Sequence, residues 1–170
     1  MDHASTPIVL LSPQGKHLDQ DIITKFSKLD NLVLICGHYA GVDERVRDHL
    51  VTEEISIGDY VLTGGELAAL VIIDSVSRFV SGVIGSEDNV QKDSITSGLL
   101  QHPLYTRPAE YRSLQVPEIL LSGNHAEIDQ WRRHESLKRT LAHRPDLLPT
   151  ADLDENDIRY LSELGYKQNS

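Results

Sequence analysis

Two short apolar runs near the start of the chain constrain its fold most strongly. The runs PIVLL and NLVLIC cover residues 7–11 and 31–36, and the polar stretch between them, residues 18–28, is predicted to be a helix. Each run is apolar throughout, which is typical of strands that are covered on both faces. The order strand, helix, strand therefore predicts an α/β domain built on a parallel sheet.

The following segments extend this domain. A second helix is predicted from Asp43, and residues 55–62 are predicted to be a strand or an extended loop that leads into the turn Thr63-Gly64-Gly65. A long helix, ELAALVIIDSVSRFV, begins at Glu66. It is apolar on nearly all sides, so we expect it to be buried within the domain or against a partner subunit, which favours dimerisation.

A linker is predicted where the apolar periodicity stops. Residues 81–97 carry Gly, Ser, Asp, Asn and Gln, which are common in linkers. We expect a first domain over residues 1–84, a linker over 85–97 and a helical second domain over 98–170. Helices are predicted over residues 124–141 and 154–164, the first with a capping box made by Asn124 and Glu127.

The charge of the chain restricts its partners. A formal net charge of −10 argues against nucleic acid, because phosphate binding depends on Lys and Arg. The charge is unevenly spread, however: residues 102–145 carry seven Lys and Arg against five Asp and Glu, whereas acids are in excess on both sides of this block. The net positive charge of this middle block is therefore compatible with a surface that faces RNA.

The cellular setting is predicted from what the sequence does not carry. The single cysteine, Cys36, excludes an intrachain disulfide, and MDHASTPIVLL lacks the build of a signal peptide. The most apolar run, residues 67–80, is interrupted by polar and charged residues and is too short to cross a bilayer. A cytoplasmic protein without a membrane span is expected.

Three glycine-bearing loops form the clearest candidate binding site. The dinucleotide motif GxGxxG and the phosphate-binding loop GxxxxGK(S/T) are absent from the sequence. Instead, SPQG, GHYAG and IGDYVLTGG at residues 12–15, 37–41 and 57–65 each follow an apolar strand. Loops at strand ends bind ligands in α/β sheets, and glycine lets the backbone approach them closely. From the residues alone, ligand binding and ordinary turns remain equal alternatives.

Single residues that carry chemistry have simpler interpretations beside the functional ones. Asp93 lies in the predicted linker, where a carboxylate is more often a solvated charge or a cap than a general base. Arg78 ends the apolar helix, where it either complements the helix dipole or binds a phosphate or oxyanion. Cys36 is expected to be a buried apolar residue without chemistry. The eight histidines show no metal-ligand spacing, so no zinc site is predicted.

Longer motifs are similar to those of one family along nearly the whole chain. The chain resembles the TrmD-type bacterial tRNA (guanine-N1)-methyltransferases of the SPOUT class. The matching segments are LSPQGK at 11–16, CGHYAGVDERV at 36–46, SIGDYVLTGGELA at 56–68, IDSVSRFVSGVIG at 73–85, DSITSGLL at 93–100, HPLYTRP at 102–108, VPEILLSGNHAEIDQWR at 116–132, and SLKRT with RPDLL within 136–148.

This resemblance implies a fold and a reaction. Residues 1–84 would form a SPOUT-type parallel sheet with a deep trefoil knot, and residues 98–170 a small helical domain that binds tRNA. The implied reaction is S-adenosylmethionine-dependent methylation of N1 of guanosine 37 in tRNA, next to the anticodon. The methyl donor would be bound by Leu10, Leu11, Ser12, Gln14, Gly37, Tyr39, Ile57, Gly58, Tyr60, Leu62, Gly64 and Gly65.

The resemblance also implies catalytic roles and an assembly. Asp93 matches the family's general base and Arg78 the arginine that holds the target guanine. Both roles suit the chemistry, because guanine N1 must lose a proton and negative charge develops on O6. The implied assembly is a homodimer in which the donor lies on one subunit and the aspartate comes from the other.

Two departures from the family pattern define the alternatives. The family implies Mg²⁺, but Ala40 stands where a glutamate near the donor methyl group is usual. The strand and PYGGG-like loop that the family has before the segment matching residues 7–11 are not among these 170 residues. One alternative is therefore a catalytically weak or silent fragment that dimerises and binds S-adenosylmethionine. Another is a different RNA-binding or nucleotide-binding module.

Overall fold

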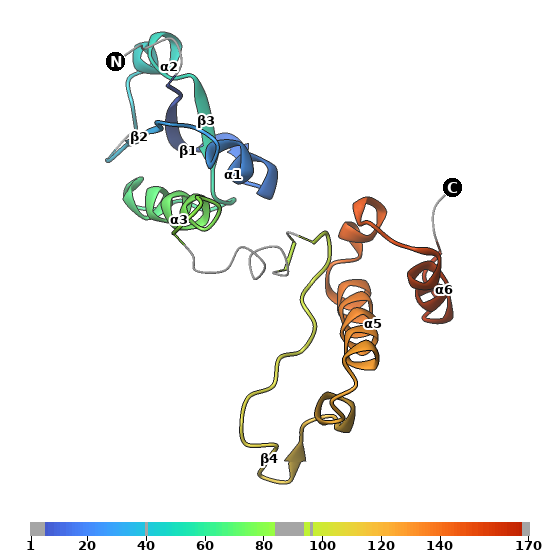
Figure 1. Ribbon diagram of the computed structural model, residues 1–170. Coiled ribbons are helices and arrows are strands. Elements are labelled where there is room, and N and C mark those ends of the chain that lie inside the picture. Colours follow the sequence, from blue (N-terminus) through green and yellow to red (C-terminus); the bar gives the residue numbers. More distant parts are fainter. Residues whose placement is uncertain (1–5, 40, 84–93, 96, 168–170) are drawn as a thin grey trace. The chain divides into compact units, whose positions relative to one another are not determined.

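A computed structural model describes residues 6–39, 41–83, 94–95 and 97–167 of the chain (Figure 1). The chain divides into two compact units, Met1–Glu87 and Asp88–Ser170. Each unit contains one cavity that is discussed as a candidate site.

The first unit is built on a parallel sheet of three strands in the order β2-β1-β3. These strands are β1 (Ile8–His17), β2 (Val33–Cys36) and β3 (Glu53–Ser56). Leu11 of β1 is aligned with Cys36 on one side and Ile55 on the other. The prediction of an α/β domain with a parallel sheet is thereby confirmed.

Strand β1 is longer than the apolar run predicted. It continues through Pro13, Gln14 and Gly15 to His17, and its register against β3 shifts so that Leu11 and Lys16 are both aligned with Ile55. The segment expected to be a loop after the strand is thus an irregularity within it. An insertion of this kind leaves residues without partners in the ladder and bends the strand, which turns polar groups of residues 12–14 toward the end of the sheet.

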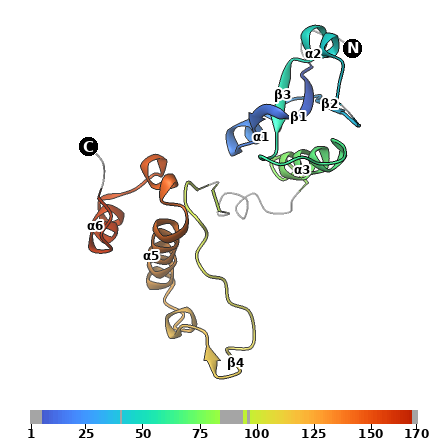
Figure 2. The same ribbon diagram turned by 180° about the vertical axis from the view of Figure 1, so that it is seen from behind.

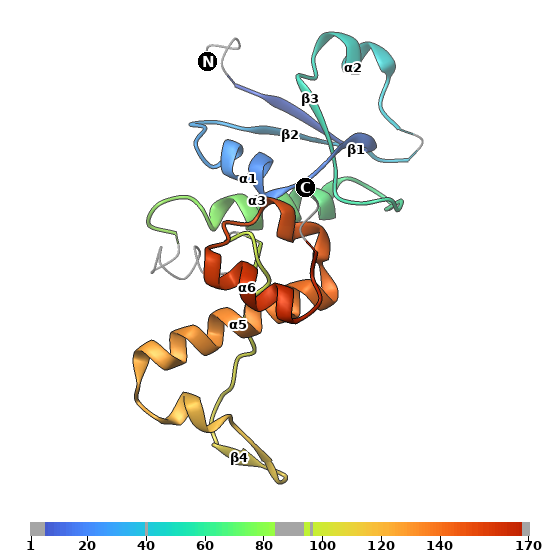
Figure 3. The same ribbon diagram turned by 90° about the vertical axis from the view of Figure 1, so that its right-hand side faces the viewer.

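Helices α1 (Gln20–Phe26) and α3 (Glu66–Ser77) lie next to each other against the sheet (Figures 1 and 3), whereas α2 (Glu44–His49) joins β2 to β3. Helix α1 begins where the predicted polar stretch allows a cap, because the Ile22 amide donates to the Asp19 carboxylate at 2.9 Å. The core between helices and sheet consists of Val9, Leu11, Ile22, Phe26, Ile55, Ala68, Ala69 and Ile72.

Helix α3 is only partly covered within the chain. Ala68, Ala69 and Ile72 are buried, but Leu67, Leu70, Val71 and Ile73 are 45–60% exposed. The helix is therefore apolar on two faces, of which the sheet and α1 cover one.

The second unit is mainly helical, as predicted, but it begins with an extended segment (Figure 2). This segment leads to a hairpin of β4 (Glu110–Tyr111) and β5 (Leu114–Gln115) and the 3-10 helix η1 (Glu118–Leu121). The longer helix α5 (His125–His143), the 3-10 helix η2 (Pro145–Thr150) and α6 (Glu155–Glu163) follow. Leu99, Leu137, Leu148 and Leu161 form its core.

The capping box predicted at the start of α5 is wrong. The Asn124 side chain makes no capping hydrogen bond, and the motif occurs instead at α6. There the Asp157 amide donates to Asp154 Oδ1 at 2.8 Å, and the Asp154 amide donates to Asp157 Oδ2 at 3.1 Å. Asp154 has the extended backbone (ψ 176°) that such a cap uses, whereas ψ of Asn124 is 94°.

None of the helices in the described ranges is both long enough and apolar enough to cross a membrane.

Candidate functional site

The three glycine-bearing segments predicted from the sequence meet at one place. Strands β1, β2 and β3 are parallel, so their carboxyl ends lie at the same edge of the sheet, where α/β folds bind ligands. A cavity of about 270 Å³ lies there, just below the ~300–1,000 Å³ typical of small-molecule sites. Every residue predicted to bind the donor lines it: Leu10, Leu11, Ser12, Gln14, Gly37, Tyr39, Ile57, Gly58, Tyr60, Leu62, Gly64 and Gly65.

Backbone hydrogen bonds join the second and third of these segments. The Gly65 amide donates to the Gly37 carbonyl at 2.9 Å, and His38 and Gly64 form an isolated antiparallel bridge. A Cβ on Gly65 would lie 2.8 Å from Cα of Cys36, so the close approach of the two chains requires glycine there. A Cβ on Gly37 would touch only the Val42 side chain, at 3.0 Å, and would otherwise face open space.

The first segment is held by a half-buried arginine that the sequence did not reveal. The Arg47 side chain, 14% exposed, donates from Nη1 to Gln14 Oε1 at 2.9 Å and to both Glu54 carboxylate oxygens at 3.1 and 3.2 Å. Its Nη2 donates to Ser12 Oγ at 3.4 Å. Arg47 therefore fixes two of the residues predicted to bind the donor. Nothing in the sequence distinguishes it from the neighbouring Arg45, which pairs with Asp43 in solvent.

Two tyrosines lie at the mouth of the cavity. Tyr39 is exposed and has a positive φ of 59°, an uncommon conformation for a residue other than glycine. Such conformations cost free energy and cluster at ligand-binding sites. The Tyr60 hydroxyl donates to the Ile57 carbonyl at 3.3 Å, which folds this side chain back over its own loop.

Cys36, at the end of β2, has a thiol with a raised pKa. Burial, and to a lesser extent the negative charge of Glu66, raise the pKa of its thiol. A raised pKa leaves less thiolate at neutral pH, and only the thiolate is a good nucleophile. Cys36 was expected to be buried; it is half-buried and packs against the core.

The charge of the cavity is low. Of the described residues that line it, Arg47 is the only one with a permanent charge, and Glu54 neutralises it. The other polar groups are backbone amides and carbonyls together with the side chains of Ser12, Gln14, His38, Tyr39, Ser56, Tyr60 and Thr63. This suits a ligand with neutral hydrogen-bonding edges better than a polyphosphate. No three His, Cys, Asp or Glu side chains gather for a metal in the described part of the chain.

The predicted catalytic residues are placed differently. Arg78 is the C-cap of α3, where its amide donates to the Asp74 carbonyl at 3.3 Å, and it is not among the described residues that line the cavity. Asp93 and Ala40 lie outside the described residues. The structure thus brings the residues predicted to bind the donor together at one cavity, and Arg78 is not part of its described lining.

Comparisons with known proteins give a consistent result. The family model for tRNA (Guanine-1)-methyltransferase TrmD matches residues 1–150. A tRNA (guanine-N(1)-)-methyltransferase from Dehalococcoides mccartyi is 54% identical over 168 residues, which are 99% of this chain and 68% of the relative. An enzyme of the same name from Listeria welshimeri is 53% identical over 156 residues, or 92% of this chain and 64% of its own length. The chain spans about two thirds of these relatives.

Proposed function

Because this chain belongs to the TrmD family of tRNA (guanine-1)-methyltransferases, we propose that it methylates N1 of guanosine 37 in tRNA, next to the anticodon. The proposed methyl donor is S-adenosylmethionine. The observation that carries the proposal is the cavity at the ends of β1, β2 and β3, which all three glycine-bearing segments line.

The chemistry of the cavity supports this donor. An adenosine offers hydrogen-bonding edges without net charge, and the backbone groups around Gly37, Gly58 and Gly64 can pair with such edges. Arg47 holds Ser12 and Gln14 in place, so these side chains are preorganised for the ligand. When bound, S-adenosylmethionine supplies an electrophilic methyl group on its sulfonium.

The proposed roles of the protein in the reaction rest on the family resemblance. The Asp93 carboxylate accepts the proton from guanine N1, whose electron pair then forms the bond to the methyl carbon while the carbon–sulfur bond breaks. Arg78 holds the guanine and stabilises the negative charge that develops on O6. The products are 1-methylguanosine and S-adenosylhomocysteine, and the proton remains on the aspartate until solvent takes it.

A homodimer is proposed for the active assembly. Leu67, Leu70, Val71 and Ile73 form an apolar face on α3 that the other described residues of the first unit leave exposed, and a second copy of this helix is a suitable cover. In this assembly Asp93 of one subunit serves the donor cavity of the other. The resemblance supports such a composite site.

The remaining proposals concern organisation. The SPOUT-type sheet with its deep trefoil knot is proposed for residues 1–84, a linker for 85–97 and tRNA binding for 98–170, and the reaction is proposed to occur in the cytoplasm. The family supports a need for Mg²⁺, whereas Ala40 removes one carboxylate that the resemblance places near it. Ala40 is also the observation that favours the second candidate, a chain that binds donor without transferring methyl groups.

Calorimetric titration with S-adenosylhomocysteine tests the donor site. We expect saturable binding that ATP does not reproduce. Gly37→Val should abolish this binding in a folded protein, because the new side chain meets only Val42 and otherwise enters the cavity. Equal affinity of the variant and the wild type for S-adenosylhomocysteine would contradict the assignment. Gly65→Val is unsuitable, because its side chain would collide with the backbone of Cys36.

A further inference from the structure

A second groove, of about 290 Å³, lies within the second unit and has no role in donor binding. We propose that it holds an unpaired nucleobase of the RNA substrate, other than the methylated guanine, together with an adjoining phosphate. The proposal rests on the proposed function, which makes RNA the substrate. The residues that carry it are His102, Leu104, Tyr105, Arg107, Leu121 and Arg132, and the groove they line is called here the Tyr105 groove.

The walls of the Tyr105 groove are fixed by the fold. The extended segment that forms one wall of the groove runs antiparallel to α5 (Figures 1 and 3). Its first residues are anchored to α5 by a hydrogen bond that the Leu100 amide donates to Thr140 Oγ1 at 2.9 Å. Arg139 Nη1 donates to the Gln101 carbonyl at 3.2 Å. At the lower end the Tyr105 and Trp131 rings lie 6.5 Å apart. The wall of the groove is thus fixed to α5 by a hydrogen bond to the buried Thr140 and by the contact between the Tyr105 and Trp131 rings.

The surface of the groove is apolar and aromatic although it faces solvent. Leu104 and Leu121 are 70% and 62% exposed, and Tyr105 is 50% exposed. Side chains of this kind are costly to leave in water, and a contiguous exposed patch of them marks a binding surface. An exposed aromatic ring is also the platform on which unpaired bases stack, with any base sequence.

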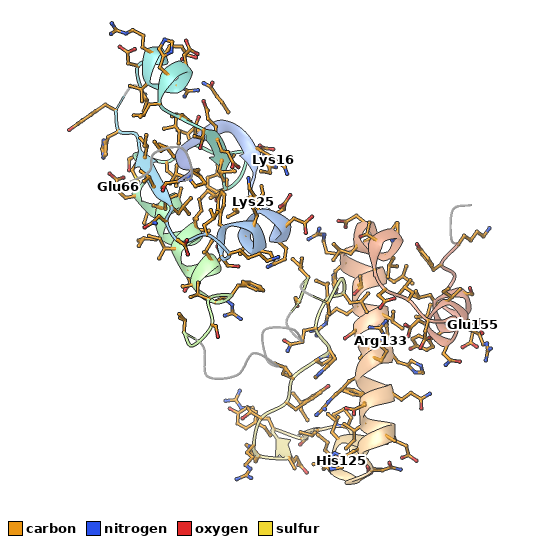
Figure 4. The ribbon with its side chains drawn as sticks, turned by 45° about the horizontal axis from the view of Figure 1, so that its top comes forward. Lys16, Lys25, Glu66, His125, Arg133 and Glu155 are labelled. Atoms are coloured by element: carbon orange, nitrogen blue, oxygen red, sulfur yellow. The ribbon has the colours of Figure 1, made fainter. Side chains whose placement is uncertain are left out.

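The charges of the groove select the occupant. Arg107, Arg132 and His102 line it, and none of its described lining residues is Asp or Glu, in a protein whose net charge is −10. The contrast with a groove between α5 and α6 is direct. There Arg133 and Arg159 lie among Asp154, Asp157 and Glu163, and Arg133 donates to Asp157 at 2.6 Å (Figure 4 shows Arg133 on α5). The described lining of the Tyr105 groove thus contains cations and no carboxylate, and the aspartate that pairs with Arg132, Asp129 at 3.2 Å, lies outside this lining.

The adjoining hairpin has the same chemistry. Val116, in the groove wall, donates its amide to the Ala109 carbonyl at 2.9 Å and so connects the groove to β4 and β5. Beyond it the Arg112 guanidinium lies 5.3 Å from the centre of the exposed Tyr111 ring. The exposed Tyr111 ring with the Arg112 guanidinium beside it suits a polyanion of stacked aromatic bases, and Glu110 of β4 is the one carboxylate within the two strands.

The protein contains its own reporter for this site. Trp131 is the only tryptophan of the chain, and it contacts Tyr105. Titration with an RNA hairpin that has an unpaired guanine-containing loop should change the Trp131 fluorescence. Tyr105→Leu should weaken RNA binding at least about fivefold, since it removes the stacking ring, whereas Tyr105→Phe should bind as the wild type does.

Arg132 and Arg144 provide a matched test of the charge. Their side chains are 47% and 45% exposed, and each pairs with a nearby aspartate, Asp129 at 3.2 Å and Asp146 at 2.7 Å. Only Arg132 lines the groove. Arg132→Ala should lower the slope of log affinity against log salt concentration by about 0.7–0.9, as expected for one lost phosphate contact, and Arg144→Ala should not.

The outcomes separate this inference from the proposed function. If Tyr105→Leu binds the hairpin as tightly as Tyr105→Phe, or if RNA binds without changing Trp131 fluorescence, the groove is not a nucleotide site, even in a protein that methylates tRNA. Equal loss of salt dependence in Arg132→Ala and Arg144→Ala would show a diffuse electrostatic surface and would also overturn it. A wild type that binds RNA in this way but transfers no methyl group leaves the groove assignment intact and contradicts the proposed function. Circular dichroism melts establish that each variant is folded.

Discussion

At the scale of single residues, the donor cavity depends on a side chain that was not among the residues predicted to bind the donor. Arg47 is enclosed between Ser12, Gln14 and Glu54, so its charge is compensated within the fold rather than by water. Arginine suits this position because its planar group donates in several fixed directions at once. Arg47 is therefore a positioning residue for the first cavity segment.

Replacing this arginine should reveal its role. Arg47→Met leaves the Glu54 carboxylate without its partner, and we expect the free energy of unfolding to fall by ~1–3 kcal/mol. The affinity for S-adenosylhomocysteine should fall as well, because Gln14 and Ser12 are no longer held. Urea unfolding and calorimetry measure the two effects. Arg45→Met is the control, since its pair with Asp43 lies in solvent and contributes little to stability; equal effects of both variants would contradict the role of Arg47.

Cys36 gives a second prediction at this scale. Burial raises the pKa of its thiol, so the thiolate fraction at pH 8 is smaller than in an ordinary cysteine, and the rate of alkylation rises only at higher pH. Iodoacetamide should modify the folded protein slowly and the urea-unfolded protein at the rate of a free thiol. Fast modification of the folded protein would mean that the thiol is activated.

At the scale of secondary structure elements, the predictions that succeeded depended on periodicity and composition. Strand β2 and helices α1, α3, α5 and α6 follow from apolar runs and helical patterns. The continuation of β1 to His17 could not be predicted, because it depends on a register shift against β3, far along the chain. Nor could the β4–β5 hairpin, since its turn residues Arg112 and Ser113 adopt positive φ values without being glycine or asparagine.

The cap predicted at Asn124 and the cap found at Asp154 can be compared by mutation. Asp154→Ala removes a side chain that accepts from the Asp157 amide, and it should lower the free energy of unfolding by ~1 kcal/mol. Asn124→Ala removes a side chain without a capping bond, so its effect should stay below ~0.5 kcal/mol. Chemical denaturation of both variants measures the difference. A larger loss for Asn124→Ala would mean that α5 is capped in solution.

The exposed face of α3 predicts the assembly state. Leu70→Glu or Ile73→Glu places a charge on this face and should convert the proposed homodimer into a monomer, as measured by sedimentation or light scattering. Leu164→Glu, at an exposed apolar position beyond α6, is the control and should leave the mass unchanged. A wild type that is already monomeric would exclude the composite site.

At the scale of the whole molecule, the net charge of −10 is reconciled with an RNA substrate by how charge is distributed. The acids are numerous, but the described lining of the Tyr105 groove contains none, and the donor cavity is close to neutral. Each compact unit thus carries one of the two sites that a tRNA methyltransferase needs. The family resemblance pointed to twelve residues that the structure brings together at one cavity, whereas Arg47 and the Tyr105 groove depend on tertiary contacts that no local motif encodes.

Transfer of a labelled methyl group from S-adenosylmethionine to unmodified tRNA, with the product nucleoside and its position identified by mass spectrometry, tests the proposed function most directly. We expect 1-methylguanosine at position 37, and a rate at least ~10²-fold lower in Asp93→Ala, with the affinity for S-adenosylhomocysteine unchanged. Saturable donor binding without any methylation of guanosine 37 by the wild-type chain would contradict the proposal and leave the donor-binding, catalytically silent alternative in its place.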